Sequence, residues 1–256
     1  MNNLIYAIIF ILLNYFLFKN IDNIAKKISL YDKPNHRKIH TEKVPLLGGV
    51  FLFINLVVFE VLNNFFNIYY SEFEKDLVDK IALYFGYISF LIVGALDDYN
   101  EYFKPIQRLF LSSAIILICI FIDRSLLLSS LDFQIFAFNL DLRQDAYWSF
   151  FLVIFCFLVL INSFNLMDGI NIIASAFVSF IFIIFYFLSI LNFPILFLIL
   201  FFIFFFFYNF KSKIFFGSSG IMPISFLIGY FFIKGYNLKF FEYSDWVFII
   251  LSVPLI

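Results

Sequence analysis

The stretch YWSFFLVIFCFLVLI, residues 147–161, contains no Asp, Glu, Lys or Arg, and the polar segment NSFNLMDGIN, residues 162–171, follows it directly. Similar apolar stretches recur along the chain without strict alternation of apolar and polar residues. Of the 256 residues, 64% are hydrophobic and only 14% are charged, and the mean hydropathy is +1.00. A soluble globular protein has about 25% charged residues. The sequence therefore predicts an integral membrane protein built from helices.

The other apolar stretches extend this prediction to an all-α, polytopic helical bundle with nine or ten membrane segments. We expect the segments at 3–18, 45–70, 81–96, 109–122, 147–161, 170–190, 194–208, 221–233 and 246–256. The last is shorter than the ~20 residues that a span needs, so we expect an incomplete final helix and a C-terminally truncated chain. Residues 1–256 then form one membrane-embedded domain. Within it, 126–141 is apolar but interrupted by serines and an aspartate, which predicts an external loop with short strands or an interfacial piece.

The charges of the loops predict which side each one faces. The loops at 19–44, 97–108, 162–169 and 209–220 together carry 11 Lys and Arg residues, whereas those at 71–80, 123–146 and 234–245 carry 6. Because Lys and Arg are enriched on the cytoplasmic side, we expect the first set to be cytoplasmic and the N-terminus to be outside. The net charge of −1 argues against a nucleic-acid-binding protein.

The first of these cytoplasmic loops carries a basic motif, DKPNHRKIHTEKVPLLGG, residues 32–49. A basic loop of this kind can simply anchor the neighbouring helix at the membrane surface. However, Arg37, Lys38 and His40 lie close together and are followed by a glycine pair at a helix start. Arg and Lys bind phosphate oxygens, and glycine lets a backbone approach a ligand closely. Phosphate recognition is therefore the sharper hypothesis.

Two acidic motifs lie on the same predicted side. Asp97 and Asp98 are adjacent at the end of a segment, where they are either a solvated helix end or ligands for Mg²⁺. Lys104 and Arg108 follow and could hold an anionic partner.

In the second acidic motif, Asn162, Asn165 and Asp168 share one face at helical spacing. They could make a structural contact between spans or line a ligand site, and we favour the ligand site. A weaker signal is the basic and small-residue stretch at 209–220. Carboxylates, amides and basic groups thus converge on one face of the membrane. This suits an enzyme that joins a phosphorylated cytosolic donor to a lipid-borne acceptor.

These motifs resemble those of the polyprenyl-phosphate N-acetylhexosamine-1-phosphate transferases, within glycosyltransferase family 4, and more closely their WecA-like branch. The matching stretches are DKPNHRKIHTEKVPLLGG (32–49), DD (97–98), NSFNLMDGIN (162–171) and NFKSKIFFG (209–217). The resemblance covers essentially the whole chain, in order, spacing and predicted side.

The resemblance implies a Mg²⁺-dependent transfer, with Mn²⁺ as an alternative metal, of a sugar 1-phosphate from a UDP-sugar to undecaprenyl phosphate. It implies N-acetylglucosamine 1-phosphate as the transferred group, UMP as the released product, and the start of a cell-envelope glycan such as O-antigen at the bacterial inner membrane. Asp97 and Asp98 match the catalytic acidic pair, and Asp98 and Asp168 are the implied metal ligands. The implied substrate-binding residues are Arg37, Lys38, His40, Lys104, Arg108, Asn162, Asn165 and Asp168. A homodimer stays open.

The chain departs from the family pattern at three places. Ser218 stands where the family has a Mg²⁺-ligating Asp, and Asn171 stands where it has a second carboxylate. The His-rich loop expected after the last segment is absent from residues 1–256. Two hypotheses follow: a working transferase, and a degenerate homologue that binds polyprenyl phosphate or a partner without metal-dependent transfer.

Overall fold

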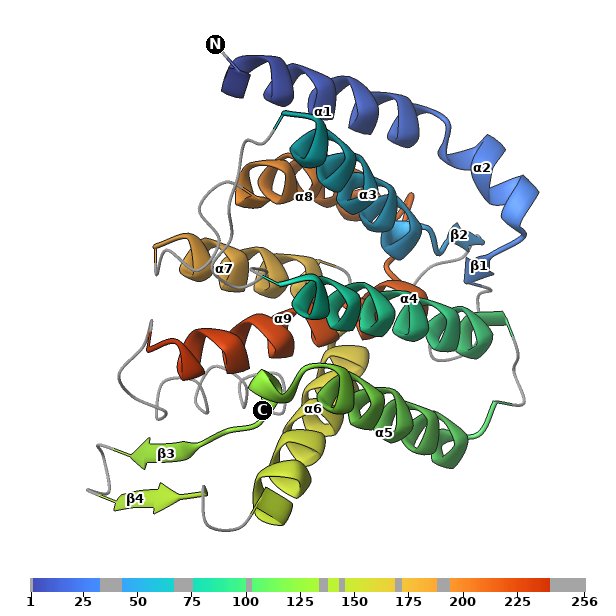
Figure 1. Ribbon diagram of the computed structural model, residues 1–256. Coiled ribbons are helices and arrows are strands. Elements are labelled where there is room, and N and C mark those ends of the chain that lie inside the picture. Colours follow the sequence, from blue (N-terminus) through green and yellow to red (C-terminus); the bar gives the residue numbers. More distant parts are fainter. Residues whose placement is uncertain are drawn as a thin grey trace.

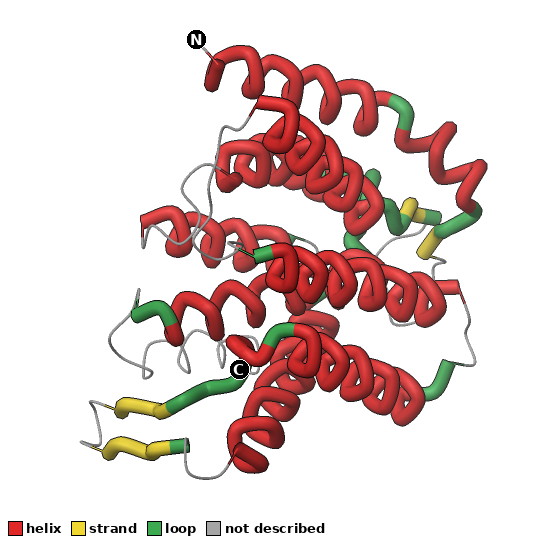
Figure 2. Tube along the Cα trace, in the orientation of Figure 1, coloured by secondary structure: helices red, strands yellow, loops and turns green. Residues whose placement is uncertain are grey.

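A computed structural model describes residues 2–32, 43–66, 76–99, 103–133, 138–142, 146–168, 172–187 and 194–239. Within these residues the chain is almost entirely helical, with two short strand pairs (Figures 1 and 2). The helices are α1 (Asn2–Lys19), α2 (Ile21–Ile28), α3 (Gly48–Phe66), α4 (Leu77–Tyr99), α5 (Pro105–Ile122), α6 (Ala146–Met167), α7 (Ile173–Phe187), α8 (Pro194–Phe210) and α9 (Ser218–Asn237). The strands are β1 (Tyr31–Asp32), β2 (Val44–Pro45), β3 (Ser130–Phe133) and β4 (Phe138–Asp141).

The helices agree with the predicted all-α membrane bundle, although not with a definite number of spans. Four of the described helices, α4, α5, α6 and α9, are long and apolar enough to cross a membrane. A fifth span results if α1 and α2, which meet at a bend of 64°, count as one. The apolar parts of α3, α7 and α8 are shorter. The expected segment 246–256 lies outside the described residues.

Helix α2 lies where the sequence predicted only a loop. It is strongly amphipathic, because Ile21 and Ala25 are buried whereas Lys26 and Lys27 are exposed. Ser29, with φ of 58°, ends the helix in the left-handed conformation. An amphipathic helix of only eight residues contains too few apolar residues to be detected by its hydropathy.

The core of the bundle is α9, which is buried from Ser219 to Gly235. It packs along α4 in the opposite direction, so the last turn of α4 meets the first turn of α9 (Figure 1). Gly94 makes this approach possible, since a Cβ there would collide with the main-chain oxygen of Ser218. Small residues at such contacts let the backbones of membrane helices pack closely.

The segment between α5 and α6 forms an antiparallel hairpin of β3 and β4, preceded by the short 3₁₀ helix η2 (Arg124–Leu126). Ser130 pairs with Asp141, and Phe133 pairs with Phe138. The short strands predicted within 126–141 are therefore confirmed.

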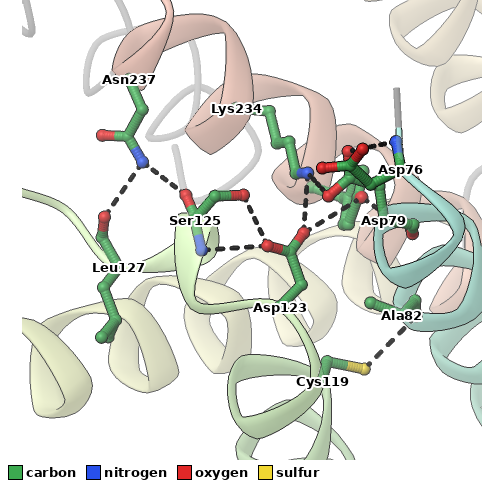
Figure 3. A network of polar contacts seen from close by, with 10 residues as sticks. Asp76, Asp79, Ala82, Cys119, Asp123, Ser125, Leu127, Lys234 and Asn237 are labelled. Carbon is green, nitrogen blue, oxygen red and sulfur yellow. Dashed lines mark hydrogen bonds and ion pairs between the residues drawn. The ribbon is translucent and has the colours of Figure 1, made fainter. Parts of the chain in front are cut away.

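A network of charged and polar side chains joins the ends of α4 and α9 that are remote from Gly94 (Figure 3). The ammonium group of Lys234 lies 2.8 Å from Asp79 Oδ1 and 2.7 Å from Asp123 Oδ2. The Asp123 carboxylate also accepts hydrogen bonds from the amide and hydroxyl of Ser125 at 2.9 and 2.6 Å. Asn237 donates to the Ser125 carbonyl oxygen at 2.7 Å. We call these residues the Lys234 network.

Candidate functional site

The site forms where the last turn of α4 meets the first turn of α9, and its first member is Asp98. Both oxygens of this carboxylate accept backbone hydrogen bonds, from the Ser218 amide at 2.9 Å and the Ser219 amide at 2.9 Å. The first amides of a helix have no partner within the helix, and the helix dipole attracts negative charge to this end. The carboxylate therefore caps the central helix.

Asp97 is the second member, and it faces both a hydroxyl and a guanidinium group. The Ser218 hydroxyl donates to Asp97 Oδ2 at 2.6 Å, and Arg108 Nη1 lies 3.2 Å from the same oxygen. Arg108 Nη2 also donates to Asn162 Oδ1 at 3.4 Å. Arg108 therefore links α4, α5 and α6, and its role in holding an anionic partner stays a prediction.

The motif on α6 supplies the third carboxylate and an amide oxygen. Asn162 and Asn165 lie on α6, and Asp168 lies one residue beyond its end. Asn165 Oδ1 is 3.2 Å from the Ser218 hydroxyl, and Asp168 Oδ2 accepts the Gly217 amide at 3.0 Å. Burial and the negative charge of Asp98 raise the pKa of Asp168 to about 7. Among the described residues, the negative charges of these neighbouring carboxylates therefore act on one another.

Gly217 is needed for this arrangement. Its φ of +65° is a conformation that side chains disfavour, and a Cβ would lie 2.7 Å from Asp98 Oδ2. The amides of Gly217, Ser218 and Ser219 then point at two carboxylates in succession. In the sequence the sign of this arrangement is weak, a small-residue turn between α8 and α9.

A buried amide holds the segment that leads into α9. Asn209 Oδ1 accepts the backbone amide of Ile172 at 3.1 Å, and Asn209 Nδ2 donates to the Ile214 carbonyl oxygen at 2.8 Å. Phe215 in turn bonds to β2 through the Pro45 carbonyl oxygen at 2.9 Å. These hydrogen bonds therefore hold the start of α7, the end of α8 and β2 against the segment that precedes α9.

The basic residues of the first loop, Arg37, Lys38 and His40, lie outside the described residues. The strands that flank them, β1 and β2, pair with each other, and β2 bonds to the segment before α9. Lys104 is described; its side chain is exposed and makes none of the described hydrogen bonds of the carboxylate cluster. Of the predicted site residues, the structure thus brings together Asp97, Asp98, Arg108, Asn162, Asn165 and Asp168.

The carboxylate and amide oxygens of the cluster fit a hard divalent cation whose coordination is completed by other ligands. Carboxylate and amide oxygens are what Mg²⁺ takes, and it commonly uses one or two carboxylates together with water and phosphate oxygens. Within the described residues, no group of three or more His, Cys, Asp or Glu side chains could hold a metal ion unaided. The carboxylates of the cluster could contribute one or two ligands to such a cation, with water and phosphate oxygens as the others.

The chain is similar to proteins of known activity. The chain is 31% identical over 150 residues to the undecaprenyl-phosphate alpha-N-acetylglucosaminyl 1-phosphate transferase of Escherichia coli K12, covering 58% of this chain and 36% of the relative. The Salmonella typhi protein of the same name is 30% identical over 165 residues, with 62% and 41% covered. The Yersinia pestis protein is 28% identical over 169 residues, with 66% and 41% covered. The matches therefore span about two fifths of the length of these relatives.

The family model described as glycosyl transferase family 4 matches residues 80–236, more than half of the chain. This range contains Asp97, Asp98 and Asp168 together with Ser218. The resemblance expected from the motifs is confirmed, and the chain belongs to glycosyl transferase family 4.

Proposed function

We propose that the protein transfers N-acetylglucosamine 1-phosphate from its UDP derivative to undecaprenyl phosphate, releasing UMP. The relatives named above are transferases of this kind. One observation in this chain carries the proposal. Three carboxylates from α4 and the end of α6 gather at the start of a buried helix, with Arg108 as their described cationic partner.

The reaction needs little more than positioning and charge neutralisation. The phosphate of the acceptor is already an anion near neutral pH, and it attacks a phosphorus atom of the donor diphosphate. Mg²⁺, or Mn²⁺ in its place, would neutralise charge on the diphosphate and on the departing UMP. Asp98 and Asp168 are the proposed ligands for the cation, and Asp97 shares the catalytic end of α4 with Asp98.

The remaining site residues have roles that follow from their chemistry. We assign a phosphate contact to Arg108, whose guanidinium group pairs with Asp97 at the edge of the cluster. Asn162 and Asn165 offer amide groups for the nucleotide or the sugar. We assign phosphate contacts to Lys104 and to the first-loop residues Arg37, Lys38 and His40.

We place the reaction on the cytoplasmic side of a bacterial inner membrane, with the N-terminus outside, because the loops at the site end carry the excess of Lys and Arg. An acceptor with a long isoprenoid tail stays in the bilayer, so its phosphate is presented at the membrane surface. A site at helix ends suits that geometry, whereas the coupling sites of transporters lie near the middle of the membrane.

The test is radiolabelled transfer from UDP-N-acetylglucosamine to undecaprenyl phosphate by the purified full chain, with and without Mg²⁺. We expect transfer that requires Mg²⁺ and falls at least about 100-fold in Asp98→Asn, as expected when a charged group is lost from an active site. The matched control is Asp22→Asn, which changes an exposed aspartate on α2 and should leave transfer unchanged. Absence of transfer with this and other UDP-hexosamines would contradict the proposal.

The alternative, a degenerate homologue without metal-dependent transfer, receives no support from the family match or the relatives. Its basis is Ser218 together with the absence of the His-rich loop from residues 1–256. The Ser218 hydroxyl joins the carboxylate cluster directly, so the loss of a carboxylate at this position leaves the rest of the cluster assembled.

A further inference from the structure

A group of exposed lysines lies on the last turn of α1, on α2 and on the turn that follows α8. These lysines, which we call the basic edge, are Lys19, Lys26, Lys27, Lys211 and Lys213. Residues 15–29 and 207–213 contain these five lysines and a single acidic residue, Asp22. Within the described part of the chain, none of the five forms an ion pair. The basic edge therefore carries a positive charge that the described carboxylates do not neutralise.

The packing of α1 against α8 brings these lysines to one end of the bundle. The rings of Phe10 and Phe197 lie 5.4 Å apart, and those of Phe18 and Tyr208 lie 5.2 Å apart, so the two helices run side by side in the same direction. Their last turns are therefore at the same level. Helix α2 bends away from α1 by 64° and lies at this same end (Figure 1).

Two of the lysines lie back along an aromatic ring of the preceding turn. The Lys19 ammonium group is 5.5 Å from the centre of the Tyr15 ring, and that of Lys211 is 4.0 Å from the centre of the Phe207 ring. Long basic side chains at the ends of membrane helices keep their apolar stems on such rings while the charge reaches the polar headgroups. Aromatic rings are also typical of the boundary between membrane and water. This pattern indicates that the basic edge lies at the level of the lipid headgroups.

Large apolar side chains are exposed beside the lysines. They include Phe16 on α1, Ile28 on α2, and Phe207 and Phe210 on α8. A soluble phosphate compound would pair with the lysines but leave these side chains in water. A lipid offers both a phosphate group and acyl chains, so it matches both kinds of side chain.

From this combination we propose that the basic edge binds anionic membrane phospholipids, with the lysines at the phosphate groups and the exposed apolar side chains at the acyl chains. Clusters of basic residues beside membrane helices attract anionic headgroups in this way. The proposal does not depend on the transfer of sugar phosphate, because none of the lysines of the basic edge belongs to the carboxylate cluster.

The experiment measures lipid binding by the purified full chain in a neutral detergent. The protein is titrated with phosphatidylglycerol or with phosphatidylcholine of the same acyl chains, and native mass spectrometry counts the lipid molecules that stay bound. We expect an apparent affinity for phosphatidylglycerol at least about tenfold higher than for phosphatidylcholine, because several lysines act on each phosphate. Equal affinities for the two lipids would overturn the proposal.

Two double variants test whether the basic edge is the place of binding. Lys26→Gln with Lys27→Gln removes two charges from α2, and Lys211→Gln with Lys213→Gln removes two from the turn after α8. Each pair should lower the affinity for phosphatidylglycerol about tenfold and leave the affinity for phosphatidylcholine unchanged. Thermal unfolding in phosphatidylcholine checks that each variant is folded, and if the pair on α2 is not, the pair after α8 decides.

The matched control is Arg124→Gln with Lys239→Gln. These two exposed side chains lie at the end of the bundle that holds the Lys234 network, so the control removes the same charge from the opposite end. It should leave the preference for phosphatidylglycerol unchanged. An equal decrease in the control would show a general effect of net charge and would overturn the assignment to the basic edge.

Glycerol 3-phosphate separates a lipid site from a site for soluble anions. It carries a phosphate group without acyl chains, and we expect that it does not displace phosphatidylglycerol at equal concentration. Displacement would overturn the lipid assignment. None of these measurements reads sugar-phosphate transfer, so a failure of the proposed function would leave the result on lipid binding intact.

Discussion

The two ends of the α4–α9 pair hold charged side chains in opposite ways. At one end Lys234 lies between Asp79 and Asp123, and the side chains of Lys234 and Asp123 are only 5% and 4% exposed. At the other end, about 27 Å along α4 at 1.5 Å per residue, three carboxylates share Arg108 and the amides at the start of α9. The first end has its cation built in, whereas at the second end Arg108 is the one cationic side chain that pairs with the three carboxylates among the residues that the structure describes.

This contrast indicates which end of the helix pair stabilises the bundle and which end binds ligand. A buried ion pair whose partners are all present holds helices together, and it becomes costly only when one partner is removed. A cluster with excess like charge weakens the folded state, and such local strain is typical of ligand sites. Replacing charges at the two ends should therefore have opposite effects on stability and on ligand binding.

The largest effect on stability should come from Lys234→Met. This change leaves the buried Asp123 and the partly buried Asp79 without their cation, and we expect a loss of about 3–5 kcal/mol in the free energy of unfolding. Denaturant unfolding in mixed micelles measures it. The matched control is Lys80→Met, which removes a more exposed partner of Glu60 and should cost no more than about 1 kcal/mol. Similar losses in both variants would contradict the contrast.

The largest effect on activity should come from Asp168→Asn. The asparagine oxygen can still accept the Gly217 amide, so the local structure is retained while a negative charge leaves the cluster. We expect transfer to fall at least about 100-fold and the free energy of unfolding to stay the same or rise by about 0.5–2 kcal/mol. Unfolding and transfer are measured on the same preparation. A clear loss of stability would contradict the prediction, because it would show that the carboxylates at this end also stabilise the fold.

A change in packing should affect the two ends unequally. Gly94→Ala places a Cβ against the Ser218 carbonyl oxygen, which is backbone and cannot move aside easily. We expect a loss of about 1–3 kcal/mol in stability, together with loss of transfer because the first turn of α9 is displaced. In Gly86→Ala, the control on the same helix, the Cβ meets the ring of Phe226 instead. It should lower stability and leave transfer per folded molecule unchanged.

The smallest effect should be a decrease in the stability of the fold at low pH. Burial tends to raise the pKa of Asp123, but the hydrogen bonds from Lys234 and Ser125 and the charge of Lys234 outweigh it, so the pKa lies below its ordinary value. A lowered pKa contributes stability above the pKa of the unfolded chain, and this contribution is lost as the pH falls through the pKa of the folded state. Stability of the natural chain should therefore decrease below about pH 4. In Asp123→Asn the decrease should be smaller, and an equal decrease would contradict the assignment.

The sequence alone predicted the long helices, although not α2, and it singled out most of the side chains that gather at the start of α9. Long apolar stretches locate helices well. The expected segment 194–208, for example, begins with α8 and ends two residues before it. The motifs also identified Asp97, Asp98, Asp168 and Arg108, because charged residues at the ends of apolar segments have few structural explanations.

The pairing of α4 with α9 and the amides at the start of α9 could not be predicted from the sequence. A helix that is apolar all round has no periodic pattern that would indicate its neighbours. The residue type also does not reveal which backbone amides bind the carboxylates. The Lys234 network was missed for a related reason. Asp79, Asp123 and Lys234 were assigned to separate loops, and only the fold brings them together. A lysine directly after the predicted span 221–233 was the available sign.

We propose that the carboxylate end of the α4–α9 pair carries the reaction, whereas the Lys234 network stabilises the fold. The decisive measurement is sugar-phosphate transfer per folded molecule for Asp168→Asn and Lys234→Met, side by side and at a temperature where both are folded. We expect Asp168→Asn to be folded but inactive, and Lys234→Met to be less stable with transfer close to that of the natural chain. Transfer by Asp168→Asn, or loss of transfer in folded Lys234→Met, would contradict this assignment.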